Sequence, residues 1–522
     1  MDYKFDTTTE PWIPVVRNGT LSEVSLRDVG ISAHEISAIS DPIPIVEFGI
    51  YRLLVALVMD IWQFEDSRDL EDLMDLEKFD PGKIENYFDK YQNRFDLFDR
   101  DWPFLQTGNM GDEPKPISGI LPSIPSGTSA YHFHHFRENN FGVAPAPAAR
   151  LLTTFAPFMT AGGAGKSPSI NGAPPWYVLI NGQSLFHTIC LNCYVGPLEL
   201  LGDAPPAWRN PLPPKSDGRC TRTSLPEALT WRPRQIQLIP DGPGVCSLTG
   251  VQSPVLVNTM KFLPGASCDF TWTDPSVPYR ITEKGSIVMR PQDGKEIWRD
   301  TGPLALLHDK TYESSDTKIR FSRPLLVDQF QRFVEDQRID KDTPLSLTVY
   351  GMRTDMKMKV FEWQREMLRI PLPMVIGSKF SLLAQEFMEE ANGVEYELKR
   401  SIKHLYPRDA AGNAKGLGTL IANTTRQFWF DLRPKYEDML NSLSNAKDEE
   451  QTSKIRDEWR DSMMKIAWNG FNSASDGFDT YADSMQREVE ARLMLKRRLF
   501  SLFETPDEKA SRIKASKKGG RD

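Results

Sequence analysis

The stretch Thr160–Pro168, which reads Thr-Ala-Gly-Gly-Ala-Gly-Lys-Ser-Pro, holds residue types that bind phosphate, and we call it the glycine loop. A nucleotide-binding P-loop needs a glycine, four residues and then Gly-Lys-Ser/Thr at the start of a helix, so that backbone N–H groups surround the phosphates. Gly165–Ser167 match this pattern, but Thr160 stands where the first glycine belongs. Pro168 and the pair Asn171-Gly172 predict that no long helix comes next. These departures argue against a nucleotide-binding enzyme that uses Gly165 and Lys166.

The same loop offers a second kind of chemistry. Gly162, Gly163 and Gly165 have no Cβ, and Ala164 has only a methyl group. Bare backbone can therefore approach a phosphate chain or the floor of a nucleic-acid groove closely. Lys166 adds one ammonium group beside it. Two interpretations stay open, a nucleic-acid contact and an ordinary surface loop.

The histidines and cysteines do not complete a metal site. His187, Cys190 and Cys193 have the spacing of half a site, but no second cysteine pair supplies the other ligands of a tetrahedral zinc. Core packing is the favoured role of these cysteines, because free cysteine is commonly buried. No nucleophile elbow, zinc-protease motif or dinucleotide fingerprint occurs either. The sequence therefore predicts no metal, no cofactor and no catalytic site.

Composition limits the class of protein. The chain has 522 residues, of which 40% are hydrophobic, so it holds two or three domains with sizeable cores. It has no long apolar run and no signal-peptide pattern at its start, and its five cysteines suit a reducing compartment, so we expect a cytoplasmic protein without membrane contact. Its net charge of −8 means that any nucleic-acid contact is local.

Residue patterns divide the chain into two parts. Strands are predicted at residues 12–16 and 21–29 around an Asn18-Gly19 turn, a buried helix at 45–64, and mixed short strands and loops at 201–350. Helical periodicity dominates beyond residue 371, in segments 380–405, 416–432, 436–443 with 455–471, and 481–503. We predict an α+β protein: a mixed α/β domain over 1–370, a four-helix bundle over 371–506 and a disordered basic tail over 507–522.

Five motifs in this order resemble one known family. They are Pro11-Trp-Ile-Pro-Val15, Trp102-Pro-Phe-Leu-Gln-Thr107, the glycine loop, Val349-Tyr-Gly-Met-Arg-Thr-Asp355 leading to Phe361-Glu-Trp363, and the helical C-terminal quarter. Together they cover essentially the full length. The family is the large subunit, often called CasA, of the type I-E CRISPR surveillance complex Cascade.

The resemblance implies a non-catalytic DNA reader. In that family the N-terminal domain inspects the short protospacer-adjacent motif in double-stranded DNA, and the subunit helps recruit a helicase-nuclease. The implied partners are the backbone and small subunits, CRISPR RNA, target DNA and that nuclease. The glycine loop, through Gly162, Gly163, Ala164, Gly165 and Lys166, corresponds to the loop that faces the minor groove of the motif. Lys261 corresponds to a lysine that reaches the motif.

A hairpin tip completes the implied DNA site. Residues Thr354, Asp355, Met356 and Lys357 correspond to the hairpin that wedges between base pairs. The family often has glutamine at the tip, whereas this chain has Met356, which fills an opened base step but cannot hydrogen-bond a base as an amide does.

The segment 131–141 resembles a loop that contacts the CRISPR RNA. Its candidate residues are Phe133, His134, His135 and Arg137, which could stack on unpaired bases or meet a phosphate. Anchoring of the loop in a core by its phenylalanines is equally open. Two rival functions also remain, the nucleotide-binding enzyme described above and a scaffold that binds only protein.

Overall fold

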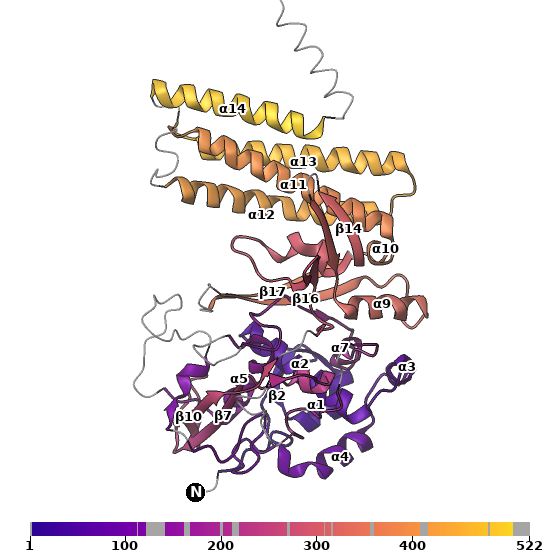
Figure 1. The fold of residues 1–522 in the computed structure, drawn as a ribbon, viewed down its shortest axis with the longest axis vertical. Coiled ribbons are helices and arrows are strands. Elements are labelled where there is room, and N and C mark those ends of the chain that lie inside the picture. Colours follow the sequence, from indigo (N-terminus) through magenta and orange to yellow (C-terminus); the bar gives the residue numbers. More distant parts are fainter. Residues whose placement is uncertain are drawn as a thin grey trace, which may run out of the picture. The chain divides into compact units, whose positions relative to one another are not determined.

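The computed structural model describes residues 3–111, 113–121, 141–160, 168–198, 202–210, 219–268, 272–306, 308–314, 317–354, 360–407, 416–478 and 481–504. These residues form two compact units (Figure 1). The N-terminal unit comprises residues 1–293 and 303–369, and the C-terminal unit comprises 294–302 and 370–522. Helices and strands mix in the first unit and long helices make up most of the second, so the predicted fold class is confirmed. The predicted basic tail, 507–522, lies outside the described residues.

The N-terminal unit begins with a hairpin of β1 (Ile13–Arg17) and β2 (Thr20–Val24), and β1 also pairs with β3 (Ile36–Ile39). Asn18 and Gly19 form the turn with φ of 52° and 74°, the left-handed conformation that favours such residues. The strand predicted over residues 21–29 ends at Val24, so the prediction was wrong for the residues after it. Ser25 caps the helix α1 (Leu26–Ser32) in a reciprocal capping box with Asp28, and this local bonding ends the strand.

Helix α2 (Pro44–Trp62) lies at the centre of this unit, and its prediction is confirmed. Almost every side chain along it is buried, including those of Glu47, Arg52 and Asp60. The acidic segment after it forms α3 (Ser67–Asp75) and α4 (Pro81–Lys90), which bury one face each. The other helices of the unit are α5 (Pro145–Leu152), α6 (Phe155–Phe158), α7 (Leu185–Asn192), α8 (Leu225–Leu229) and α9 (Leu325–Glu335).

Small sheets complete the N-terminal unit. One has the order β4 (Lys115–Pro116), β10 (Leu256–Pro264), β7 (Arg234–Asp241), and another the order β17 (Val360–Ile370), β16 (Leu345–Thr354), β5 (Tyr177–Ile180). A four-stranded sheet has the order β13 (Gly285–Val288), β12 (Tyr279–Thr282), β15 (Thr317–Ser322), β14 (His308–Ser314). Two short pairs are β6 (Arg219–Cys220) with β11 (Ser267–Cys268) and β8 (Gly244–Val245) with β9 (Gln252–Ser253).

Four long helices, α11 (Ser378–His404), α12 (Leu417–Ser444), α13 (Glu449–Ser475) and α14 (Ala482–Phe503), run side by side in the C-terminal unit after the short α10 (Leu372–Ile376) (Figure 1). The apolar stripe predicted on α11 is buried from Phe387 to Leu405. The periodicity had divided α12 at Pro434, but the helix continues through it. Pro434 lies on the exposed side, where water can bond the carbonyl group that proline leaves without a donor.

Residues 294–302 contribute to the core of the C-terminal unit. The ring of Trp298, which is buried, packs 5.7 Å from Trp429 and 5.2 Å from Tyr436 between ring centres. Arg299 lies over Trp429 and forms an ion pair of 3.3 Å with Glu395. No residue pattern had indicated that this segment belongs with the bundle.

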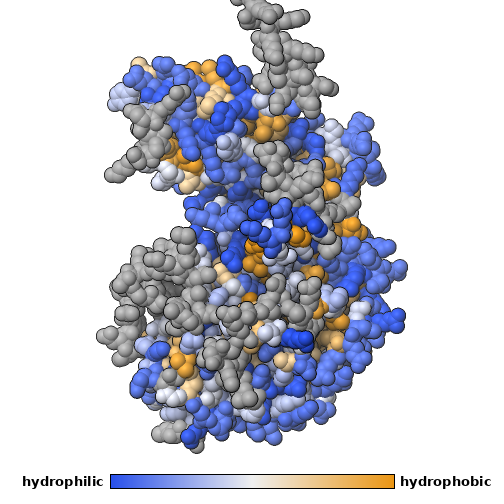
Figure 2. Space-filling view, viewed as in Figure 1, coloured by the Kyte–Doolittle hydropathy of each residue, from blue (hydrophilic) through white to orange (hydrophobic). Residues whose placement is uncertain are grey.

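The surface is mainly polar. On the face drawn in Figure 2, hydrophilic residues cover most of the described surface, and apolar residues lie in small patches. Within the described residues, no helix combines the length and the apolar composition needed to cross a bilayer.

Candidate nucleic-acid interface

The two ends of the glycine loop are fixed to each other and to the protein core. The backbone N–H of Ser169 donates to the carbonyl of Met159 at 2.8 Å, and the buried Arg234 of β7 donates to the carbonyl of Thr160 at 2.6 Å. The five predicted contact residues, Gly162 to Lys166, lie outside the described residues. A tight turn from Ser169 to Gly172 comes directly after the loop, and the next helix begins only at Leu185. Residues 168–184, all of which the structure describes, therefore contain no helix of the kind that a P-loop requires at this position.

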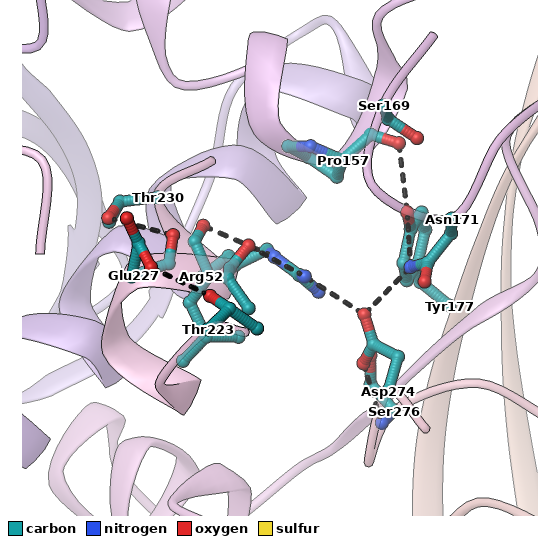
Figure 3. A network of polar contacts seen from close by, with 12 residues as sticks. Arg52, Pro157, Ser169, Asn171, Tyr177, Thr223, Glu227, Thr230, Asp274 and Ser276 are labelled. Carbon is teal, nitrogen blue, oxygen red and sulfur yellow. Dashed lines mark hydrogen bonds and ion pairs between the residues drawn. The ribbon is translucent and has the colours of Figure 1, made fainter. Parts of the chain in front are cut away.

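A buried polar network holds both flanks of the loop (Figure 3). The hydroxyl of Tyr177 donates to the carbonyl of Pro157 at 2.9 Å and accepts from the amide of Asn171 at 3.1 Å. The same Asn171 amide donates to Asp274 at 2.8 Å, and Arg52 forms an ion pair of 2.9 Å with Asp274. Residues before and after the glycine loop are thereby joined to one strand and to helix α2.

The charge at the centre of this network is compensated. Burial alone raises the pKa of Asp274, but Arg52, Ser276 and Asn171 outweigh burial and lower that pKa below its ordinary value. Asp274 is therefore a carboxylate at neutral pH, although it is fully buried. A buried ion pair with further hydrogen bonds is costly to break, because one charge then stays without its partner.

Lys261 lies on the half-buried face of β10. Its register partner on β7 is Gln237, and both contact the backbone of Met110: the Lys261 ammonium donates to the carbonyl, and the Gln237 side chain accepts from the N–H at 3.1 Å. An ammonium has three N–H donors, so one bond to Met110 leaves donors for another acceptor. The bond to Met110 therefore orients the Lys261 side chain, the one predicted to reach the motif.

The predicted wedge is the connection between β16 and β17. Thr354 is the last residue of β16, while Asp355, Met356 and Lys357 lie outside the described residues. Both strands of this hairpin contact one buried carboxylate on α2: the Tyr350 hydroxyl and the Arg365 guanidinium, the latter at 2.9 Å, donate to Oε1 of Glu47. Burial raises the pKa of Glu47, and these two donors offset only part of that effect.

Gly351, in the motif that leads to the wedge, lies against the ring of the buried Trp176. A Cβ on Gly351 would overlap the carbon atoms of that ring. We expect Gly351→Ala to destabilise the protein by about 1–3 kcal/mol, as overpacking does in other cores. Thermal unfolding measures this loss. Gly418→Ala is the control, since the Cβ that it adds meets no described atom within 4 Å outside its chain neighbours and its own helix backbone. Equal midpoints for the two variants would contradict the packing argument.

The predicted RNA contacts, Phe133, His134, His135 and Arg137, lie outside the described residues. Nearby, Gly142 donates its N–H to the hydroxyl of Ser247 at 3.2 Å, and Val143 forms a bridge with Val257 of β10. The residues that follow the RNA candidates therefore pair with the sheet that carries Lys261.

Cysteines pack in the core of the N-terminal unit. Cys190 and Cys193 are fully buried, and burial raises the pKa of both thiols. Cys246 accepts a hydrogen bond from the N–H of Ala144 at 3.3 Å. Within the described residues, no group of three or more His, Cys, Asp or Glu side chains is arranged to hold a metal.

Sequence patterns missed the anchoring residues. Glu47, Arg52 and Asp60 are charged residues on an otherwise apolar helix, and each bonds a buried side chain from another segment of the chain. A charge in such a helix requires a partner, because burial of an unpaired charge is costly. The three charges were a usable signal for a buried polar network, although they do not identify the partners.

Together these features define a class of protein, an α+β fold of two units. In its N-terminal unit, buried side chains on helix α2 and strand β5 anchor the flanks of a glycine loop and the strands of a hairpin. The family model described as CRISPR-associated protein Cse1 matches residues 6–469. The chain therefore belongs to the Cse1 (CasA) family, and the identification from its motifs is confirmed.

Individual relatives agree with this assignment. CRISPR-associated protein CasA/Cse1 of Thermus thermophilus is 29% identical over 419 residues, covering 77% of each chain. A crystal structure of a CRISPR-associated protein from Thermus thermophilus has a TM-score of 0.75 at 23% identity and covers 96% of this chain and 100% of its own. A chain of a CRISPR RNA-guided surveillance complex has a TM-score of 0.71 at 17% identity, with coverage of 96% and 100%. The last two likenesses concern the fold.

Proposed function

We propose that this chain is the non-catalytic large subunit of a CRISPR RNA-guided surveillance complex, where it recognises the protospacer-adjacent motif in double-stranded DNA and begins duplex opening. Family membership supports this role, as does the likeness to a chain of a CRISPR RNA-guided surveillance complex. The single observation that carries the DNA-reading part is the strand pair β5–β16. It anchors the flanks of the glycine loop on one strand and continues into the hairpin tip on the other.

The glycine loop is proposed to read the minor groove. That groove is narrow and shows a degenerate pattern of acceptors, so small residues that bring backbone N–H groups close suit it. Gly162, Gly163, Ala164 and Gly165 supply this backbone, and Lys166 supplies a cation for a phosphate or a base edge. Such reading is relaxed in sequence, which leaves most of the specificity to guide RNA pairing.

The hairpin tip from Thr354 to Lys357 is proposed to enter the base step next to the motif. Opening a step costs a few kcal/mol, which several modest backbone and phosphate contacts offset together. Met356 fills the opened step by apolar contact.

We further propose that the chain contacts the other components of the complex. The residues proposed to contact CRISPR RNA are Phe133, His134, His135 and Arg137. The bundle contacts the other subunits, and the assembled complex recruits the helicase-nuclease.

Lys261→Met tests the motif contact directly. Methionine keeps the length of the side chain but loses the ammonium group, so we expect the preference for motif-bearing over motif-free duplex to fall about tenfold, within the usual value of a base-edge contact. Binding by the reconstituted complex measures this ratio. Lys115→Met is the control: Lys115 pairs with Met260, the residue before Lys261, so its side chain lies on the opposite face of the same sheet. Unchanged preference in Lys261→Met would remove this residue from the site.

The experiment for the function as a whole is reconstitution. The chain, the other complex proteins and guide RNA are mixed with duplexes that carry or lack a candidate motif, and binding is measured with and without this chain. Motif-dependent binding only when the chain is present supports the proposal. Assembly into the complex without any effect on DNA binding would favour a protein-only scaffold.

A further inference from the structure

Two directly paired residues join the flanks of the glycine loop to strand β16, which leads to the hairpin tip. Tyr177 of β5 and Tyr350 of β16 are register partners in the antiparallel ladder. Tyr177 bonds both flanks of the glycine loop, at Pro157 and Asn171. Tyr350 lies four residues before Thr354, where the described part of the hairpin ends. One cross-strand pair therefore connects the supports of the two proposed DNA elements.

Two neighbouring residues of helix α2, Phe48 and Glu47, contact this pair. The ring of Phe48 packs against both tyrosines and against the loop flank, with ring centres 4.8 Å from Tyr177, 5.2 Å from Tyr350 and 5.8 Å from Phe158. Its neighbour Glu47 accepts from the Tyr350 hydroxyl. All of these residues belong to the N-terminal unit and are almost completely buried. Close packing of this kind leaves side chains few alternative positions.

Both hydroxyl groups serve as donors with defined acceptors. Burial raises the pKa of Tyr177 and of Tyr350, so both stay protonated at neutral pH. The Tyr177 hydroxyl donates to the carbonyl of Pro157. No DNA group needs to reach either tyrosine. The Tyr177 hydroxyl bonds the flanks of the glycine loop, and the Tyr350 hydroxyl shares Glu47 with Arg365 on the other strand of the hairpin.

We propose that Tyr177 and Tyr350 are a positioning pair that sets the distance between the glycine loop and the hairpin tip, and so fixes which base step opens relative to the motif. This inference rests on the proposed function. Misplacement of a positioned group by about 1 Å costs enzymes roughly a hundredfold, so a small shift between the two elements has a measurable effect.

The test uses the reconstituted complex with Tyr177→Phe and, separately, Tyr350→Phe, which remove one hydroxyl and keep the ring. Duplexes carry 2-aminopurine at one of the first three base pairs beside the motif, because its fluorescence rises when the base unstacks. In the wild type the rise is expected mainly at the pair next to the motif. In each variant we expect that signal, per bound complex, to fall about tenfold and to appear at neighbouring pairs.

Tyr87→Phe is the matched control. The Tyr87 hydroxyl is also buried, donates to Asp60 and accepts from Trp208 at 2.7 Å. Among the described residues, it bonds neither the loop flanks nor the strands of the hairpin. Thermal midpoints of the three variants separate a general loss of stability from mispositioning. If the tyrosine variants open the wild-type step, or lose signal only as Tyr87→Phe does, the positioning inference is wrong. A wild-type complex without motif dependence would overturn the proposed function and the inference with it.

Discussion

Gly163→Asp should abolish motif-dependent DNA binding by the assembled complex, with a loss of about a hundredfold or more in affinity for motif-bearing duplex. The substitution adds a Cβ where bare backbone is proposed to approach the groove, and it places a carboxylate beside the phosphates. Like charges placed together at an interface cost several kcal/mol. Binding titrations at one fixed salt concentration measure the loss, because affinities for DNA depend steeply on salt.

Two controls keep this result specific. Gly242→Asp places the same side chain at a glycine whose Cβ would meet no atom within 4 Å, in the turn after β7. Its complex should bind DNA like the wild type. Size-exclusion chromatography tests whether the Gly163→Asp variant still joins the complex, as we expect. Equal binding by the two aspartate variants would mean that the glycine loop does not contact DNA.

Asp274→Asn should destabilise the N-terminal unit by about 3–5 kcal/mol, the usual cost of breaking a buried ion pair by removing one partner. Asparagine keeps the shape but leaves Arg52 buried without its carboxylate. Asp89→Asn is the control, because its ion pair with Arg27 is exposed and contributes at most about 1 kcal/mol. Denaturant midpoints measure both, and adding Arg52→Met to Asp274→Asn should recover part of the loss.

The same ion pair predicts a pH dependence. The pKa of Asp274 is lowered in the folded protein from an ordinary value of 3.8. Such a carboxylate stabilises the fold above its unfolded pKa, and that contribution is lost as the pH falls through the folded pKa. The stability difference between wild type and Asp274→Asn should therefore be full near neutral pH and shrink below about pH 4. A difference that grows on acidification would contradict the ionised state of Asp274.

Local patterns predicted the elements but not their anchoring. The apolar run of α2 and the stripe from Phe387 to Leu405 predicted helices, because burial of one face or of a whole helix shows directly in residue spacing. The predicted boundary between segments 416–432 and 436–443 was wrong, and Pro434 between them is tolerated because its cost is small on a face open to water. Residues 294–302 carried no periodic signal for joining the bundle, and Trp298 and Arg299 bind it through side-chain contacts that residue spacing does not reveal.

The order of the motifs identified the family, and glycine and lysine spacing singled out the loop as a candidate site, which stays a prediction. The residues that support the loop could not be predicted from sequence. The supports of the loop come from Arg52, Tyr177, Asn171 and Asp274, which are scattered over more than two hundred residues of sequence. No local pattern encodes such pairs, because only the tertiary fold brings them together.

The most direct single measurement is the affinity of the reconstituted complex for two duplexes that differ only in the adjacent motif, with this chain present and with it omitted. The proposed role predicts a preference for the motif-bearing duplex of at least tenfold with the chain, and none without it. Equal affinity for both duplexes in the presence of the chain would show that this protein does not read the motif.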